Sequence, residues 1–214
     1  MTEKMNLKEL EKKTYRFTFQ DGIYDIMFGF LFVSFALAPI IRELIGLGYI
    51  LFIGIPAPLL LTLGKKYITT PRIGIVKFGM NRQNSQKKQI IISIILVLIT
   101  IILLMMTITN IFPGTFGSML NGYIVPLVIG ISTIIGMGIF AYIKDFPHLC
   151  IYGMIIGLAI IVAEVLYKIV GTPLDGILAF GIPGLLVLFY GSFILFKFLQ
   201  KYPLPEEEII NGSY

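Results

Sequence analysis

The sequence predicts an all-α membrane protein, a polytopic bundle of six transmembrane helices with both termini in the cytoplasm. Three observations predict this class. Apolar residues make up 57% of the 214 residues and charged residues only 14%, against about a quarter charged in an ordinary soluble domain. Six stretches are long and apolar enough to span a hydrocarbon core of about 30 Å, which needs about 20 helical residues. Lysine and arginine alternate between dense and sparse segments along the chain.

The same composition excludes several other classes of protein. There is too little charge to cover the surface of a soluble globular domain, and a disordered chain would be poor in apolar residues. A disulfide scaffold is excluded because the chain has one cysteine. What remains is a protein whose main solvent is lipid.

The six predicted spans follow from the apolar runs and their boundaries. The run 89–143 contains no charged residue and is too long for one span. Asn110-Ile-Phe-Pro-Gly in its middle is a turn signal, so the run is predicted to form two helices. Arg42-Glu43 leaves almost no loop between the first two spans. Because backbone groups cannot stay unpaired in lipid, each span should be fully helical. The predicted spans are 22–41, 44–63, 89–109, 122–143, 148–170 and 176–196.

The basic residues predict the orientation of these spans. With the N-terminus inside, all but two of the 17 lysines and arginines fall in cytoplasmic segments, the exceptions being Arg42 and Lys168. Basic loops favour the cytoplasmic side, so a multi-pass protein of the cell membrane is expected. Residues 1–21 form a cytoplasmic N-terminal segment, either an amphipathic helix on the membrane surface or a solvated tail. The six-helix domain covers 22–197, with a basic cytoplasmic loop at 65–88, and a cytoplasmic tail covers 198–214.

The net charge of +5 is expected to serve topology and lipid binding. The loop 65–88 carries seven basic residues and no acidic one, so it should lie against anionic headgroups at the cytoplasmic face. Aromatic residues are sparse among these bases, whereas nucleic-acid platforms interleave the two. No nucleic-acid partner is therefore expected, and a protein partner or a homo-oligomer is left open.

Small residues and a repeated tripeptide mark the helices. Gly153 with Gly157, and Ser132 with Gly136, are pairs spaced to allow close helix approach. Gly-Ile-Pro occurs at both 54–56 and 181–183. The repetition favours a duplicated hairpin or arises by chance, and both interpretations remain open.

The candidate intramembrane polar site consists of Glu164, Lys168, Tyr190 and Thr100. Glu164 and Lys168 lie four apart on the fifth span, so they share a face in the favourable order. Glu164 falls inside the predicted hydrocarbon, where ionisable residues are functional candidates by default. It is either a proton or cation site or one half of a structural ion pair. Tyr190 lies midway along the sixth span, and Thr100 belongs to a hydroxyl stripe on the third.

Two carboxylates open the first span, and both are interpreted as structural. Asp21 and Asp25 lie four apart at the inner end of the span. A carboxylate there caps free N–H groups and is favoured by the helix dipole, which accounts for Asp21. Asp25 lies one turn deeper and is expected to pair with Arg16 or Arg72, holding the basic loop in place.

The chain lacks recognisable catalytic motifs. It contains no P-loop, no His-Glu-x-x-His and no Gly-x-Ser-x-Gly. His148 is the only histidine, with too few potential ligands near it in sequence for a metal site. The sequence therefore predicts a non-enzymatic membrane protein without cofactor or metal, with an accessory or partner-binding role. The alternative is a small-solute or ion transporter that uses Glu164.

Overall fold

The computed structural model describes residues 19–73, 123–144 and 146–203, together with a series of helical positions between 91 and 105. Regular structure in this part of the chain is entirely helical, which confirms the predicted all-α class. Four helical segments are long and apolar enough to cross a membrane: Ile23–Ile73, Ile124–Lys144, His148–Val170 and Leu174–Lys201. Four predicted features lie wholly or partly outside the described residues: 1–18 of the N-terminal segment 1–21, 74–88 of the basic loop 65–88, Thr100, and 204–214 of the tail 198–214.

The first of these segments folds back on itself. Helix α2 (Ile23–Ile45) ends at a turn over Gly46–Gly48, a few residues beyond the predicted boundary at Arg42-Glu43. Gly46 has a φ of 58°, a left-handed conformation that glycine adopts at little cost. The returning arm packs against α2, so the structure contains the predicted hairpin, while the total of six spans stays a prediction. The arm consists of α3 (Tyr49–Gly54), α4 (Pro56–Gly64), a π-helical turn (Lys65–Thr69) and α5 (Thr70–Ile73).

The C-terminal half forms three further long helical segments. Both copies of Gly-Ile-Pro start a new helix at or next to the proline, at the beginning of α4 and at the beginning of α11. A proline in the first helical turn lacks only a donor that would have no partner there. The elements are α8 (Ile124–Lys144), α9 (His148–Val170), α10 (Leu174–Gly176), a π-helical turn (Ile177–Gly181) and α11 (Ile182–Lys201).

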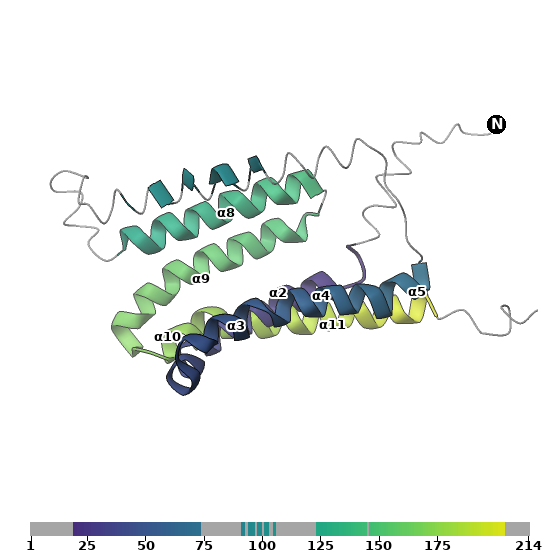
Figure 1. The fold of residues 1–214 in the computed structure, drawn as a ribbon, viewed down its shortest axis with the longest axis horizontal. Helices are drawn as coiled ribbons and strands as arrows, with labels where there is room; N and C mark the ends of the chain where they lie inside the picture. Colours follow the sequence, from purple (N-terminus) through teal and green to yellow (C-terminus); the bar gives the residue numbers. More distant parts are fainter. Residues whose placement is uncertain are drawn as a thin grey trace, which may run out of the picture.

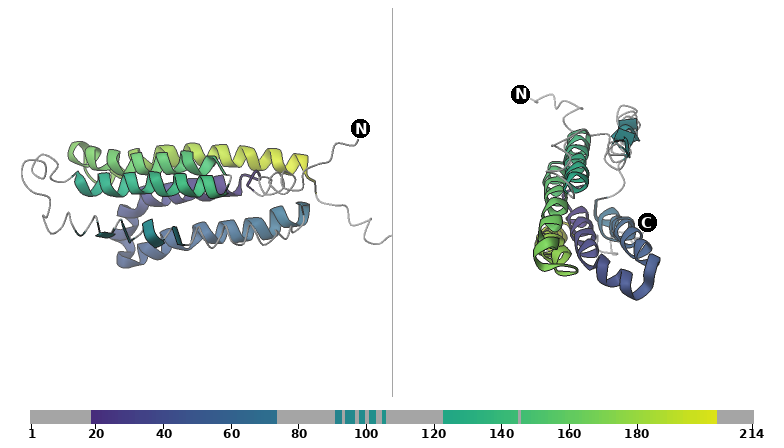
Figure 2. Two further views of the ribbon diagram at one scale, coloured as in Figure 1. Left: turned by 90° about the horizontal axis from the view of Figure 1, so that it is seen from above. Right: turned by 90° about the vertical axis from the view of Figure 1, so that its left-hand side faces the viewer.

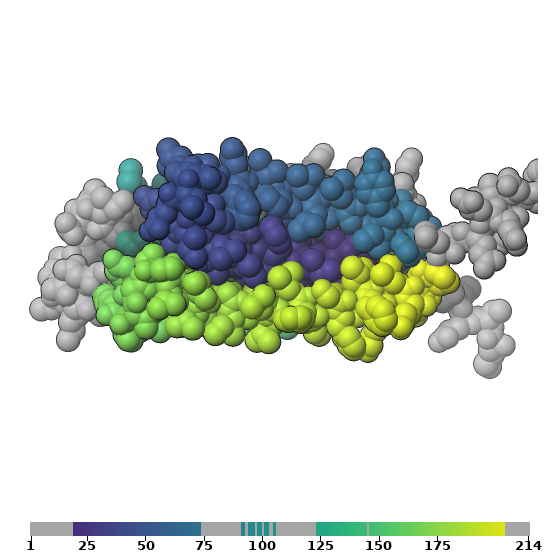
Figure 3. All heavy atoms as spheres, turned by 90° about the horizontal axis from the view of Figure 1, so that it is seen from below, coloured from purple at the N-terminus to yellow at the C-terminus, as the bar shows by residue number. Residues whose placement is uncertain are grey.

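The long helices are arranged as two pairs (Figure 1). Helix α8 packs along α9, and α2 packs along α11. Seen end-on, α8, α9 and α11 form one layer, with α2 and then the returning arm to one side of it (Figure 2). Figure 3 shows α2 as a strip enclosed between α11 and the returning arm. Helix α2 is therefore the most central element of the described structure.

Glycines hold the α2–α11 pair together at backbone distance. A Cβ atom added at Gly29 would lie 2.6 Å from the backbone nitrogen of Leu188, and one at Gly191 would lie 2.7 Å from that of Ile26. Such small residues let membrane helices approach closely without a hydrophobic driving force between them. The α8–α9 pair uses the same device, and the predicted contact role of Gly153 and Gly157 is confirmed, since both meet α8.

The two pairs meet in an aromatic core at the end where α9 begins. Phe19 stacks on Phe146 with ring centroids 4.9 Å apart, and Phe28 lies 5.0 Å from the ring of Tyr152. Phe32 is fully buried beside them. This core joins α2 to α9 and closes one end of the space between the pairs.

Burial in this protein is inverted relative to a soluble domain. Leu44 and Phe189 are 77% and 73% exposed, whereas Asp21 and Asp25 are 0% exposed. A contiguous apolar exterior of this extent marks contact with a membrane or a partner, and charges inside a membrane helix bundle face its interior. The distribution, together with the long apolar helices, is compatible with an integral membrane protein.

Candidate functional site

Six polar side chains from three segments converge where α2 and α9 begin. Asp21 and Asp25 come from the start of α2, and Asp21 also accepts a hydrogen bond from the backbone N–H of Ile23 at 3.2 Å. The other members come from the π-helical turn after α4 and from the first turns of α9. We refer to the set as the carboxylate cluster: Asp21, Asp25, Lys65, Thr69, His148 and Tyr152.

Asp21 is fully paired. Its Oδ2 atom accepts hydrogen bonds from the Lys65 ammonium and the Thr69 hydroxyl, each at 2.5 Å. Lys65 and Thr69 lie one turn apart on the returning arm, so both reach the same carboxylate. The Lys65 Nζ atom also lies 4.9 Å from the centre of the Tyr24 ring. Asp21 therefore joins the returning arm to α2 through a pair with Lys65 that the sequence did not predict.

Asp25 is only half paired, although it is equally buried. Its Oδ1 atom accepts a hydrogen bond from the Tyr152 hydroxyl and lies 3.2 Å from Nδ1 of His148. Its Oδ2 atom is buried and has no hydrogen-bond partner. Leaving a buried polar atom unpaired costs about 1 to 3 kcal/mol, and more for a charged group. Such an atom in a folded protein is therefore a candidate for binding or proton transfer.

A cavity of about 640 Å³ opens beside Asp25. Its wall includes the polar side chains of Gln20, Asp25, Tyr142 and His148 and the thiol of Cys150. We call it the Asp25 cavity. Its volume falls within the range of about 300 to 1,000 Å³ that small-molecule sites occupy. The buried Asp25 side chain thus forms part of the wall of this cavity.

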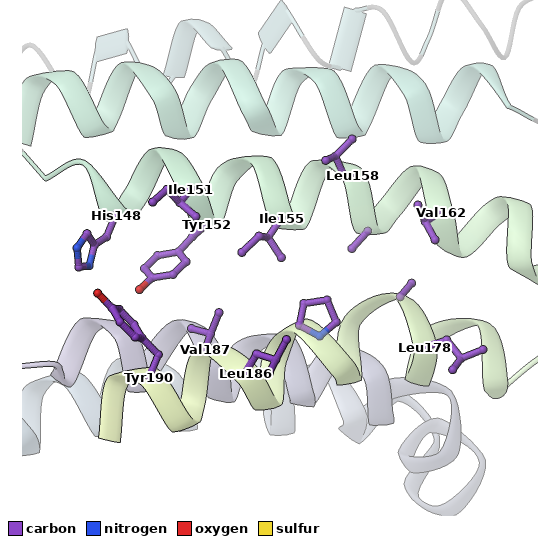
Figure 4. Close-up of a pocket in the computed structure, with 13 residues that line it drawn as sticks. His148, Ile151, Tyr152, Ile155, Leu158, Val162, Leu178, Leu186, Val187 and Tyr190 are labelled. Carbon is purple, nitrogen blue, oxygen red and sulfur yellow. The ribbon is translucent and has the colours of Figure 1, made fainter. Parts of the chain in front are cut away.

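A second space runs between α9 and α11 and is almost entirely apolar. This α9–α11 groove encloses about 620 Å³ and begins at His148, Tyr152 and Tyr190 (Figure 4). The Tyr190 hydroxyl points toward the His148 ring, and the centroids of the two rings are 6.0 Å apart. His148 lines both the groove and the Asp25 cavity. It therefore forms a shared wall between a polar chamber and an apolar channel.

The three candidate residues that the structure describes, Tyr190, Glu164 and Lys168, do not converge on one site. Tyr190 lies beside His148, whereas Glu164 lies 16 residues further along α9, about 24 Å at the helical rise. Glu164 lines a separate cavity of about 360 Å³ with Tyr167 and Asp175. Lys168 places its Nζ atom 3.5 Å from the centre of the Tyr123 ring. Although both residues are described, no ion pair joins Glu164 to Lys168.

The expected pairing of Asp25 with Arg72 is not among the contacts of either residue. Arg72 donates from Nη1 to the Ile68 carbonyl at 2.8 Å, and its Nε atom is buried without a partner. Asp25 instead contacts α9, more than 120 residues away in sequence. The sequence did carry a usable signal, because the predicted topology places Asp25 and His148 at the same end of the bundle.

The described residues contain no group of three or more His, Cys, Asp and Glu side chains arranged to hold a metal ion. The polar groups around Asp25 are its own Oδ2 atom, the His148 imidazole and the Tyr152 hydroxyl, with the Tyr190 ring next to His148. Searches against protein-family models, characterised proteins and solved structures found no match to this chain.

Proposed function

We propose that this protein is a non-enzymatic membrane carrier of protons or small cationic solutes, and that Asp25 is its binding carboxylate. One observation carries the proposal, namely the fully buried Asp25 side chain whose Oδ2 atom has no partner and which borders a cavity. Ionisable residues inside membrane helices commonly mark ion pathways and proton relays. The sequence predicted, as an alternative, a transporter that uses Glu164. The proposal keeps the transporter and assigns its binding carboxylate to Asp25, which contacts the opposite end of α9.

The surrounding groups suit this role. Tyr152 and His148 engage Oδ1 and so fix the orientation of the carboxylate. An ionised carboxylate only accepts hydrogen bonds, so Oδ2 is suited to a cation or to a proton. An imidazole can take up and release a proton near neutral pH, and His148 contacts Asp25 and lines both spaces. The cluster can therefore bind a positive charge or pass a proton across the contact between α2 and α9.

We also retain the predicted topology as part of the proposal. Six spans with both termini in the cytoplasm place the carboxylate cluster toward the cytoplasmic face of the cell membrane, and the basic loop 65–88 against anionic headgroups. The accessory or partner-binding role stays a prediction. Such a role requires an exposed apolar face, but lipid can cover that face as well as a partner protein can. It also does not account for a buried carboxylate with one unpaired oxygen beside a cavity.

The test is flux in proteoliposomes that contain a pH-sensitive dye. The wild-type protein should dissipate an imposed gradient of H⁺, Na⁺ or K⁺ faster than empty vesicles, and Asp25→Asn should reduce flux to the empty-vesicle level. Glu164→Gln is the matched control, because it removes the same charge from a distant cavity at the other end of α9 and should leave flux unchanged. Full flux in the Asp25→Asn protein, or wild-type flux no faster than that of empty vesicles, would overturn the proposal.

A further inference from the structure

We infer that the ion this carrier moves is the proton, and that His148 passes it between the Asp25 cavity and the Asp25 carboxylate. The inference rests on the proposed function, because it names the substrate of the same site. Two observations carry it. The unpaired Oδ2 atom of Asp25 is buried, and His148 contacts the carboxylate while it also lines the cavity.

The burial of Asp25 favours a proton over a larger cation. The side chain is 0% exposed, and its Oδ2 atom is buried without a partner. A metal ion that enters a protein site exchanges its water shell for several ligands, and in the described part of the chain no three His, Cys, Asp or Glu side chains are placed to supply them. A proton needs no such shell. Its uptake also removes the charge of a buried carboxylate that has donors on one oxygen only.

The Asp25 cavity can supply this proton through water. The cavity encloses about 640 Å³, and a water molecule takes up about 30 Å³ in the liquid, so there is room for several. The polar wall residues Gln20, Tyr142 and His148 offer the hydrogen-bond partners that water in a protein needs. The His148 side chain is 33% exposed, whereas that of Asp25 is 0% exposed. Water can therefore reach the imidazole but not the carboxylate.

The two nitrogens of the His148 ring connect water to the carboxylate. Nδ1 lies 3.2 Å from Oδ1 of Asp25, and Nε2 has no hydrogen-bond partner among the described residues. With the hydrogen of the neutral ring on Nδ1, a hydronium ion in the cavity gives a proton to Nε2 and becomes water. The proton on Nδ1 then moves to Oδ1. The products are a neutral imidazole with its hydrogen on Nε2 and a neutral carboxylic acid, and the reverse steps release the proton.

The charges around Asp25 leave its own charge without a fixed partner. Asp21 is balanced by Lys65 at 2.5 Å. Lys65 also acts on Asp25 through space, but of the cationic side chains in the described residues only His148 makes an ion-pair contact with it. The other titratable groups that face Asp25 or the cavity carry no positive charge: Tyr142, Cys150, Tyr152 and Tyr190. A proton on His148 or on Asp25 itself supplies the missing balance.

Infrared spectroscopy of the purified full-length protein tests whether Asp25 binds a proton and no other cation. The carbonyl stretching band of a protonated carboxylic acid, taken as the difference between wild type and Asp25→Asn, should grow as the pH falls. Na⁺ or K⁺ should leave the midpoint of this titration unchanged. A cation that bound the ionised carboxylate would lower the midpoint by about one pH unit for each tenfold excess over its dissociation constant, and this shift would overturn the assignment.

Flux through the wild-type protein gives a second measurement that needs no variant. Vesicles loaded with K⁺ and treated with valinomycin develop an inside-negative potential, and external N-methylglucamine leaves the proton as the only small cation that can enter. A pH-sensitive dye inside should report faster acidification than in empty vesicles. Replacing N-methylglucamine with Na⁺ should not slow it. Slower acidification in Na⁺ would show that Na⁺ uses the site and would overturn the inference.

His148→Gln tests the relay in the same vesicles. The glutamine amide can donate a hydrogen bond to Asp25, but it does not exchange a proton near neutral pH. The acidification rate should therefore fall by about tenfold or more, while the Asp25 infrared band persists at equilibrium. Glu164→Gln, at the distant cavity, is the matched control and should keep the wild-type rate. His148→Asn replaces His148→Gln if the latter does not fold, and a wild-type rate in the folded variant would overturn the relay.

These outcomes differ from a failure of the proposed function. Competition by Na⁺, or an unaffected His148→Gln protein, overturns the inference, and Asp25-dependent flux then still supports a carrier of small cations. Flux that does not depend on Asp25 overturns the proposed function itself, whatever the infrared titration shows.

Discussion

Replacing Lys65 with methionine should destabilise the protein strongly, because it leaves Asp21 buried without its counter-charge. The Lys65 Nζ and Asp21 Oδ2 atoms are 2.5 Å apart, with side chains 20% and 0% exposed. At an effective dielectric constant of about 20 this separation corresponds to about 7 kcal/mol of Coulomb attraction before desolvation. Measured losses on breaking a buried pair are about 3 to 5 kcal/mol, and we expect that range for Lys65→Met.

The single cysteine provides the assay. Cys150 is partly buried, so a fluorogenic maleimide should report its exposure as the detergent-solubilised protein is heated. At about 2 to 4 °C per kcal/mol for a chain of this size, the midpoint of Lys65→Met should fall by about 6 to 20 °C. Lys66→Met is the matched control, because its neighbouring side chain is exposed and its loss should shift the midpoint little.

A double-mutant cycle tests the cause of the loss. Asp21→Asn combined with Lys65→Met removes both charges, so the double variant should recover much of the stability lost in Lys65→Met. A midpoint for Lys65→Met equal to that of Lys66→Met would refute the ion pair as a stabilising contact. Additive losses in the double variant would show that the two charges do not act on each other.

Two further predictions concern contacts around Asp25. Gly191→Ala should destabilise the protein by about 1 to 3 kcal/mol, because its Cβ atom would lie 2.7 Å from the α2 backbone. Gly138→Ala, whose Cβ atom would meet nothing within 4 Å, should leave the melting midpoint unchanged. Equal midpoints for the two variants would contradict close packing at Gly191. Tyr152→Phe removes the hydroxyl donor to Asp25 and should cost about 1 to 3 kcal/mol and slow proteoliposome flux. Tyr67→Phe, at a 64% exposed ring, should change neither, and a Tyr152→Phe protein with wild-type flux would exclude the hydroxyl from the site.

Much of the fold was accessible from local sequence patterns. The predicted span 148–170 coincides with α9, and 122–143 differs from α8 by no more than two residues at either end, because apolar runs bounded by proline, glycine and charge define a helix locally. The boundary near Arg42 was placed too early. Charges at a membrane surface do not end a helix, whereas the left-handed φ of Gly46 does.

The site was less accessible, because its pairings depend on which helices pack together. Sequence spacing placed Glu164 and Lys168 on one face, yet Lys168 lies over Tyr123 of another segment. For Asp25 the expected partners were Arg16 or Arg72, and its partners in the structure are His148 and Tyr152. That choice depends on the approach of α2 to α9, which no short-range pattern encodes.

The contrast between the two aspartates links the packing to the proposed transport. Asp21 takes its partners from its own helix and from the arm that returns along it, so its bonds lie within one packed unit. Asp25 bonds to α9, which belongs to the other helix pair. Within each pair glycines bring the helix backbones together. In the described part of the chain α2 and α9 make few contacts, and these include the aromatic core and the Asp25 bonds. A cation or proton that binds Asp25 changes the bonds that cross this contact, and rocking of one helix bundle against another is a common route to alternating access. The half-paired carboxylate thus lies where a ligand can alter the contact between the two pairs.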